Sequence, residues 1–134
     1  MESMNKDEKF QRGILHFNAG EFFEAHEVWE EIWLEETEPE KTFLQGIIQI
    51  AAAFHHYCRE NTDGTETLLA AGIVKLSRFP VDHRGLAIEE LRAAAKQWAR
   101  NIGRGENPKR SEIPRLRFSE THPAIDGPRS KDRR

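Results

Sequence analysis

The chain has 134 residues, one cysteine and a formal net charge of −3. This length is typical of one domain that buries a single hydrophobic core without disulfides, and the lone cysteine, Cys58, excludes an internal disulfide and a paired-cysteine zinc site. No stretch reaches the roughly 20 apolar residues of a membrane-spanning helix, and residues 1–6 show no signal or transit peptide, so we expect a cytoplasmic protein.

Apolar residues at helical spacing predict five α-helices and no strands. In chain order, the expected helices cover residues 6–18, 21–36, 40–60, 65–79 and 83–102. The third is apolar on most sides, with Phe43 and Phe54 on one face and Leu44 and Ile48 on another, so we expect it at the centre of the fold. The sequence therefore predicts an all-α protein, a single compact irregular antiparallel bundle of about five helices.

Turn residues separate these helices. Gly20 permits a left-handed cap after the first helix, and Pro39 and Pro80 break the helical pattern. The sequence Asn-Thr-Asp-Gly at residues 61–64 predicts a turn, and Asp82 is placed to cap the fifth helix.

The end of the chain differs in charge from the rest. Residues 1–103 contain 18 acidic and 11 basic residues, a balance of −7, whereas residues 104–134 contain 5 acidic and 9 basic residues, a balance of +4. This end contains one aromatic residue, Phe118, and no stacking motif, so we expect no nucleic-acid partner. We predict a helical domain over residues 1–118 and a mobile basic tail over residues 119–134.

Apolar residues near this boundary, Ile113, Leu116 and Phe118, are expected to be able to dock back onto the bundle.

The second helix carries the main candidate site. At about 100° per residue, Phe22, His26, Trp29 and Trp33 fall within one stripe, and Glu30 lies beside it. A buried imidazole and carboxylate must be paired, hydrogen-bonded or bound to a ligand. We therefore expect an internal polar cluster centred on His26 and Glu30, with Trp29 and Trp33 as the pocket aromatics.

The third helix offers further polar groups to this cluster. A short connection through Pro39 predicts that the second and third helices pack antiparallel, which brings Gln49 or His56 towards His26. His55 lies farther round the helix, and we expect it at the surface or the rim. The expected cluster comprises His26, Glu27, Glu30, Gln49 and His56.

Three interpretations of the cluster remain open. His26 and Glu30 form a structural pair that fixes the register of the bundle, or they belong to a small-ligand or divalent-metal pocket, or they form a catalytic site with one of them as base. The pattern resembles the zinc-peptidase sequence His-Glu-x-x-His with Glu30 in place of the second histidine. Two ligands do not hold a metal, so the expected metal set is His26, Glu30 and His56. His16, His83 and His122 show no partner at a useful spacing.

Residues 13–33 look like one tetratricopeptide unit, a helical hairpin that turns at Asn18-Ala19-Gly20. A second match, over residues 51–76, lacks the same residues, and about three repeats are needed for a stable array. The alternative function is therefore a noncatalytic helical-hairpin module that binds a protein partner through the acidic face of the second helix.

Two longer motifs give the closer resemblance. They are Phe17-Asn18-x-Gly20-x-Phe22-x-Glu24-Ala25-His26-Glu27-x-x-Glu30-x-x-Trp33 and Phe43-Leu44-Gln45-Gly46-Ile47-Ile48-Gln49-x-Ala51-Ala52-Ala53. Through them, residues 10–80 resemble the family called domain of unknown function 309, a group of small helical bacterial and archaeal proteins. The resemblance implies an all-α domain of about five helices and no established activity. The residues themselves favour a pocket for a small ligand or a divalent metal, with hydrolysis as one chemistry it could support.

Overall fold

The structure is a computed structural model that describes residues 4–119. Its elements are α1 (Lys6–Asn18), α2 (Phe22–Glu35), α3 (Glu40–Cys58), α4 (Thr62–Leu76), the 3-10 helix η1 (His83–Gly85), α5 (Ile88–Gly103) and the 3-10 helix η2 (Arg110–Glu112). The described residues contain no strand, only an isolated bridge between Leu86 and Phe118. The all-α prediction is confirmed. None of the described helices is long and apolar enough to cross a membrane.

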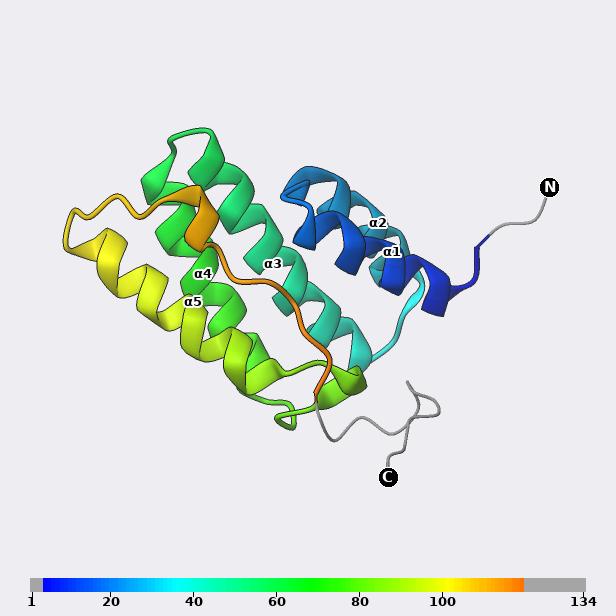
Figure 1. Ribbon diagram of the computed structural model, residues 1–134. Coiled ribbons are helices and arrows are strands. Elements are labelled where there is room, and N and C mark those ends of the chain that lie inside the picture. Colours follow the sequence, from blue (N-terminus) through cyan, green and yellow to red (C-terminus); the bar gives the residue numbers. More distant parts are fainter. Residues whose placement is uncertain (1–3, 120–134) are drawn as a thin grey trace, which may run out of the picture.

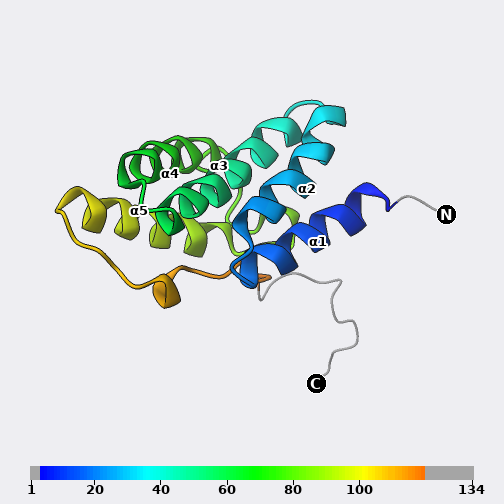
Figure 2. The same ribbon diagram turned by 90° about the horizontal axis from the view of Figure 1, so that it is seen from above.

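Each helix packs against the next along the chain, and α3 lies in the middle (Figures 1 and 2). Lys41 at the start of α3 donates to the backbone oxygen of Trp33 near the end of α2, at 2.6 Å. At the opposite ends of these helices, the rings of Phe22 and Phe54 lie 5.8 Å apart. Helices α2 and α3 are therefore antiparallel, as the short connection predicts.

The hydrophobic core surrounds α3. Phe43, Leu44, Ile50 and Phe54 are each 0% exposed, so both apolar faces of this helix are covered. Burying a side chain of this size contributes about 1.5–3 kcal/mol. The prediction that the third helix is central is confirmed.

Two helix starts differ from the prediction. Asn61, expected in a turn, is the N-cap of α4, where its side-chain oxygen accepts the N–H of Gly64 at 3.0 Å. The left-handed residue at this corner is Glu60, with φ of 64°. Asp82 precedes η1 without capping it through its side chain, and α5 begins five residues later than expected, at Ile88.

The C-terminal segment, residues 104–119, crosses the face formed by α1, α3 and α5 (Figure 1). Leu116 is 6% exposed, and Ile113 and Phe118 pack against the core. The docking of these three side chains is confirmed. Ser119, expected in the tail, donates its backbone N–H to Gly85 at 2.7 Å. The rest of the expected tail, residues 120–134, lies outside the described residues, so the boundary at residue 118 stays a prediction.

Candidate functional site

His26 and Glu30, the expected centre of the cluster, lie on different parts of α2. His26 is half-buried and lines a cavity with residues of α3, whereas Glu27 and Glu30 are exposed. The prediction that Glu30 points inward is therefore wrong. Its backbone lies about 40° round the helix from His26, where a long carboxylate side chain extends into solvent instead of between the helices.

The two expected pocket aromatics have different environments. Trp29 is 0% exposed and donates its indole N–H to the backbone oxygen of Phe10 at 3.1 Å, so it belongs to the core. Trp33 is half-buried, and the ammonium group of Lys41 lies 4.0 Å from the centre of its ring. Only Trp33 remains at the surface between α2 and α3.

A cavity of about 170 Å³ opens where the start of α2 meets the end of α3. We call this cavity the histidine pocket. Its lining residues are Phe23, His26, Ala52, His55 and His56. The Phe23 ring, which is 46% exposed, lies 6.0 Å from the His26 ring with 22° between their planes, and 5.4 Å from the His55 ring. The pocket therefore combines imidazole groups with an aromatic wall.

The His55 imidazole favours its neutral form. Burial is the main cause that lowers the pKa of His55 from 6.5, and the charges of Arg59, His56 and His26 lower it further, against a smaller opposite effect of Glu24. The side chain of Asn61 donates to Nδ1 of His56 at 3.1 Å. A neutral His56 ring then carries its proton on Nε2.

Three buried polar atoms on α2 and α3 have no hydrogen-bond partner among the described residues. They are Nδ1 of His26 and Nε1 of Trp33, both on α2, and Oε1 of Gln49 on α3. His26 and Trp33 are seven residues apart and so share a face of α2. Gln49 lies at the middle of α3, opposite the middle of antiparallel α2. We call these three residues the α2–α3 seam.

The expected metal set is not assembled. Between residues 4 and 119, no group of three or more His, Cys, Asp or Glu side chains is arranged to hold a metal ion. Glu30 is exposed, whereas His26 and His56 line the pocket with His55. The structure therefore keeps two of the three expected metal ligands near one another but offers them no carboxylate.

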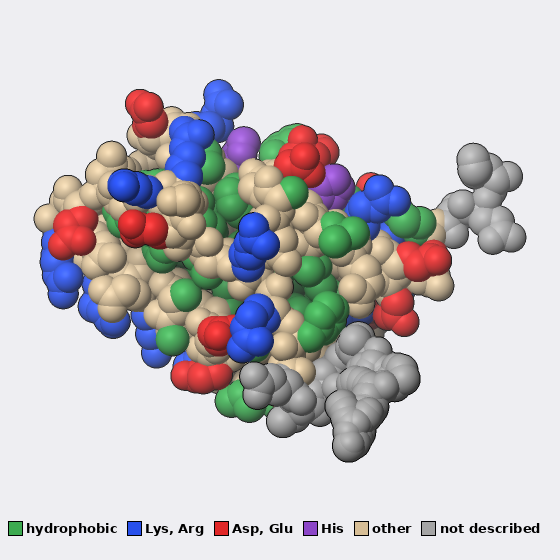
Figure 3. All heavy atoms as spheres, in the orientation of Figure 1, with side chains coloured by type: hydrophobic (Ala, Val, Ile, Leu, Met, Phe, Trp, Pro, Cys, Tyr) green, Lys and Arg blue, Asp and Glu red, His purple; other side chains and the backbone are tan. Residues whose placement is uncertain are grey.

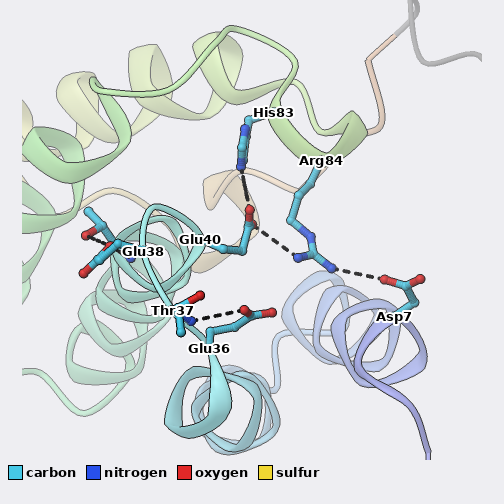
Figure 4. Close-up of polar contacts among 8 residues, drawn as sticks. Asp7, Glu36, Thr37, Glu38, Glu40, His83 and Arg84 are labelled. Carbon is cyan, nitrogen blue, oxygen red and sulfur yellow. Dashed lines mark hydrogen bonds and ion pairs between the residues drawn. The ribbon is translucent and has the colours of Figure 1, made fainter.

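A second polar cluster was missed by the sequence analysis (Figure 4). Glu40 at the start of α3 lies between His83, with its Nε2 at 3.1 Å, and Arg84, at 3.2 Å. Arg84 also reaches Asp7 of α1 at 3.4 Å and covers the Phe10 ring at 4.2 Å. The prediction that His83 has no partner is wrong, because its partner lies 43 residues away in the sequence.

Arg84 adopts a left-handed backbone conformation, with φ of 55°. This conformation is uncommon for a residue with a side chain and is held here by the surrounding contacts. His16, also expected to lack a partner, lies 2.7 Å from the Glu21 carboxylate. His122 lies outside the described residues.

The comparisons with known proteins agree with the motifs that cover α1 to α3. The matching family model is "Domain of unknown function (DUF309)", over residues 10–68. Residues 10–68 of this chain match this family model. The histidine pocket and the α2–α3 seam lie within this DUF309 region.

Two relatives are similar to more than half of this chain. An uncharacterized protein of Aquifex aeolicus (strain VF5) is 31% identical over 78 residues, which cover 58% of this chain and 23% of the relative. The uncharacterized protein YpuF of Bacillus subtilis (strain 168) is 39% identical over 80 residues, which cover 58% of this chain and 43% of YpuF. The matched part of this chain therefore spans less than half the length of either relative.

Proposed function

We propose that this domain is a noncatalytic binding domain for a small planar ligand, which enters the histidine pocket and forms hydrogen bonds with His26 and Gln49 of the α2–α3 seam. The observation that carries the proposal is the grouping of unpaired polar atoms on α2 and α3. Each buried donor or acceptor without a partner costs about 1–3 kcal/mol. A ligand that supplies partners to His26 and Gln49 would recover part of that free energy.

The size and chemistry of the pocket limit the ligand. A dry cavity of about 150 Å³ accommodates benzene, so the histidine pocket, at about 170 Å³, suits one ring. Phe23 provides an aromatic surface for stacking, and the lowered pKa of His55 favours the neutral form of that imidazole near pH 7. We therefore expect a single-ring molecule that carries both hydrogen-bond donors and acceptors.

The acid–base pair of His26 and Glu30 expected from the sequence is not formed at this pocket. No carboxylate is among the lining residues, and Glu30, the expected base, is exposed. General acid–base chemistry requires a proton donor or acceptor within hydrogen-bond reach of the reacting group.

Nuclear magnetic resonance titration with nicotinamide, benzamide and uracil tests this proposal. We expect at least one of the three to produce saturable shifts at the amides of Phe23, Ala52 and His55. His26→Ala should remove these shifts, whereas the control His16→Ala should retain them, because His16 pairs with Glu21 at 2.7 Å and does not line the pocket. Saturable shifts that persist in His26→Ala, or the absence of shifts with all three probes, would contradict the proposal.

A second function is supported by the outward face of α2. Phe23 and Leu34 are 46% and 67% exposed, and the exposed carboxylates of Glu27 and Glu30 lie between them in the sequence. This spacing places apolar and acidic groups along one side of the helix. We propose as the alternative that this side of α2 binds a basic, apolar surface of a protein partner. Shifts at Phe23 and Leu34 that appear only with protein partners and not with single-ring probes would favour it.

A further inference from the structure

The C-terminal segment is held through its backbone at several points. The side chain of Asn18 donates to the backbone oxygen of Leu116 at 3.0 Å and accepts the backbone N–H of the same residue at 2.8 Å. The indole N–H of Trp98 donates to the oxygen of Glu112 at 3.3 Å, and the hydroxyl of Tyr57 donates to the oxygen of Pro108. Such contacts depend on an extended backbone and little on the side chains of the bound segment.

The groups that hold the segment belong to different helices. Asn18 ends α1, Tyr57 lies on α3 and Trp98 lies on α5, so the three surround one face of the bundle (Figure 1). Burial raises the pKa of Tyr57, with a smaller contribution from Glu112, so the phenol keeps the proton that it donates. This face therefore presents fixed hydrogen-bonding groups along an extended path.

The segment also contacts the bundle through its own side chains. The amide oxygen of Asn107 lies 2.7 Å from the Tyr57 hydroxyl, Arg110 donates to the backbone oxygen of Cys58, and Ile113 and Phe118 pack against the core.

Among residues 104–119, Leu116 is the one fully buried side chain. Arg117 forms two contacts with the Glu90 carboxylate of α5, at 2.8 and 3.1 Å. A leucine next to an arginine in an extended chain is thus one part of the pattern that this face binds.

The segment does not fill the face. A cavity of about 220 Å³ lies between it and the α1–α2 turn, and one of about 270 Å³ lies between it and α5. Both are lined by Pro114 and Arg115. In Figure 3, basic side chains lie over the path of the segment, with hydrophobic groups on both sides.

We propose that the face of α1, α3 and α5 is a docking groove for an extended, basic segment of a partner protein, and that residues 106–119 occupy this groove in the isolated chain. Charge supports a basic occupant, because residues 1–103 carry a balance of −7. An incoming segment places its leucine at the site of Leu116 and an arginine beside Glu90. It competes with the chain's own segment, which is present at a high effective concentration.

Competition for the groove can be measured with the full-length protein. The probe is a fluorescent peptide with the sequence of residues 106–119, and its binding is followed by anisotropy. Leu116→Ala in the protein weakens the binding of the chain's own segment to the groove. This variant should therefore bind the peptide at least about tenfold more tightly than the unchanged protein does. A peptide whose own leucine is replaced by alanine should lose that gain.

Two further variants of the Leu116→Ala protein test the groove itself. Adding Asn18→Ala should weaken peptide binding by at least about tenfold, because two hydrogen bonds are lost. Adding Gln97→Ala should leave binding unchanged, since this exposed amide pairs with Asn101 outside the groove. If circular dichroism shows that the Leu116→Ala protein has lost its helices, Arg117→Glu takes its place. This substitution also loosens the segment, because the new carboxylate repels Glu90.

Three results would overturn the proposal. The first is that the loosened variants bind the peptide no more tightly than the unchanged protein. The second is that Asn18→Ala and Gln97→Ala have equal effects. The third is that the loosened variants form a dimer and bind no peptide, which would show that the groove exchanges segments between two copies of this chain.

Discussion

The stability of this protein should depend on pH through His55. Its pKa in the folded state is lowered from 6.5, mainly by burial. Just below pH 6.5 the unfolded chain therefore binds more protons than the folded chain, and the free energy of unfolding falls as the pH falls through this window. Urea unfolding at about pH 7.5 and about pH 5.5 should show a smaller difference for His55→Gln than for the unchanged protein.

The matched control for this prediction is His16→Gln. His16 is paired with Glu21 at 2.7 Å and lies outside the histidine pocket. The two variants therefore separate the effect of the pocket from the loss of any one imidazole. An undiminished pH dependence in His55→Gln would show that another group causes it.

Helical periodicity predicted that both His26 and Glu30 face the interior. His26 is half-buried, whereas Glu30 is exposed. The sequence specifies the direction of a backbone position round a helix to within tens of degrees. A glutamate at the edge of an apolar stripe can still extend its carboxylate into solvent. His26, nearer the middle of that stripe, has a shorter side chain and stays between α2 and α3.

Among the elements, α1 and α2 approach most closely at Gly13. A Cβ atom on Gly13 would lie 2.1 Å from Nε1 of Trp29, and the indole is fixed by its hydrogen bond to Phe10. Gly13→Ala should therefore lower the free energy of unfolding by about 1–3 kcal/mol, the usual cost of overpacking a core. Thermal or urea unfolding measures this loss.

Gly103→Ala is the control for that experiment. Its Cβ atom would meet Oε2 of Glu66 at 3.0 Å, and this flexible side chain can move away. We expect a change of less than about 1 kcal/mol, because alanine also favours the helix. Equal losses in the two variants would contradict the role assigned to the Gly13–Trp29 contact.

The existence and order of the helices could be predicted because apolar spacing and turn residues agree along most of the chain. The start of α4 could not, since Asn61 and Gly64 suit a turn as well as they suit a capped first helical turn. The position of η1 escaped prediction for a different reason. The left-handed residue there is Arg84, at φ of 55°, and no local signal marks an arginine for that conformation.

For the molecule as a whole, Glu40 links parts of the chain that are far apart. It contacts His83 and Arg84, and Arg84 continues to Asp7, so the cluster connects α1, α3 and η1 (Figure 4). Glu40→Gln should lower the free energy of unfolding by roughly 1 kcal/mol, because these half-buried charges lose a common partner. Urea unfolding at neutral pH measures the effect.

Glu89→Gln is a suitable comparison. Glu89 pairs with Arg92 on the surface of one helix, and its side chain is 59% exposed, against 23% for Glu40. We expect its loss to be the smaller one. A larger loss in Glu89→Gln would mean that the Glu40 cluster does not hold the distant parts together.

The contacts of Glu40 also show why the second cluster could not be found from the sequence. Its histidine lies 43 residues away and its arginine 44. Helical spacing relates residues within one element, whereas these pairs depend on how the elements are placed in space.

The central position of α3 has a practical consequence for choosing fragments. The stretch recognised as DUF309 ends at residue 68, inside α4, and so omits Leu69 and Leu76, which are both 0% exposed. A fragment that ends at residue 68 would expose the apolar side of α3 that α4 covers, and it should precipitate or remain unfolded. Truncated versions should extend past Leu116, because the family match covers fewer residues than the chain needs to form its core.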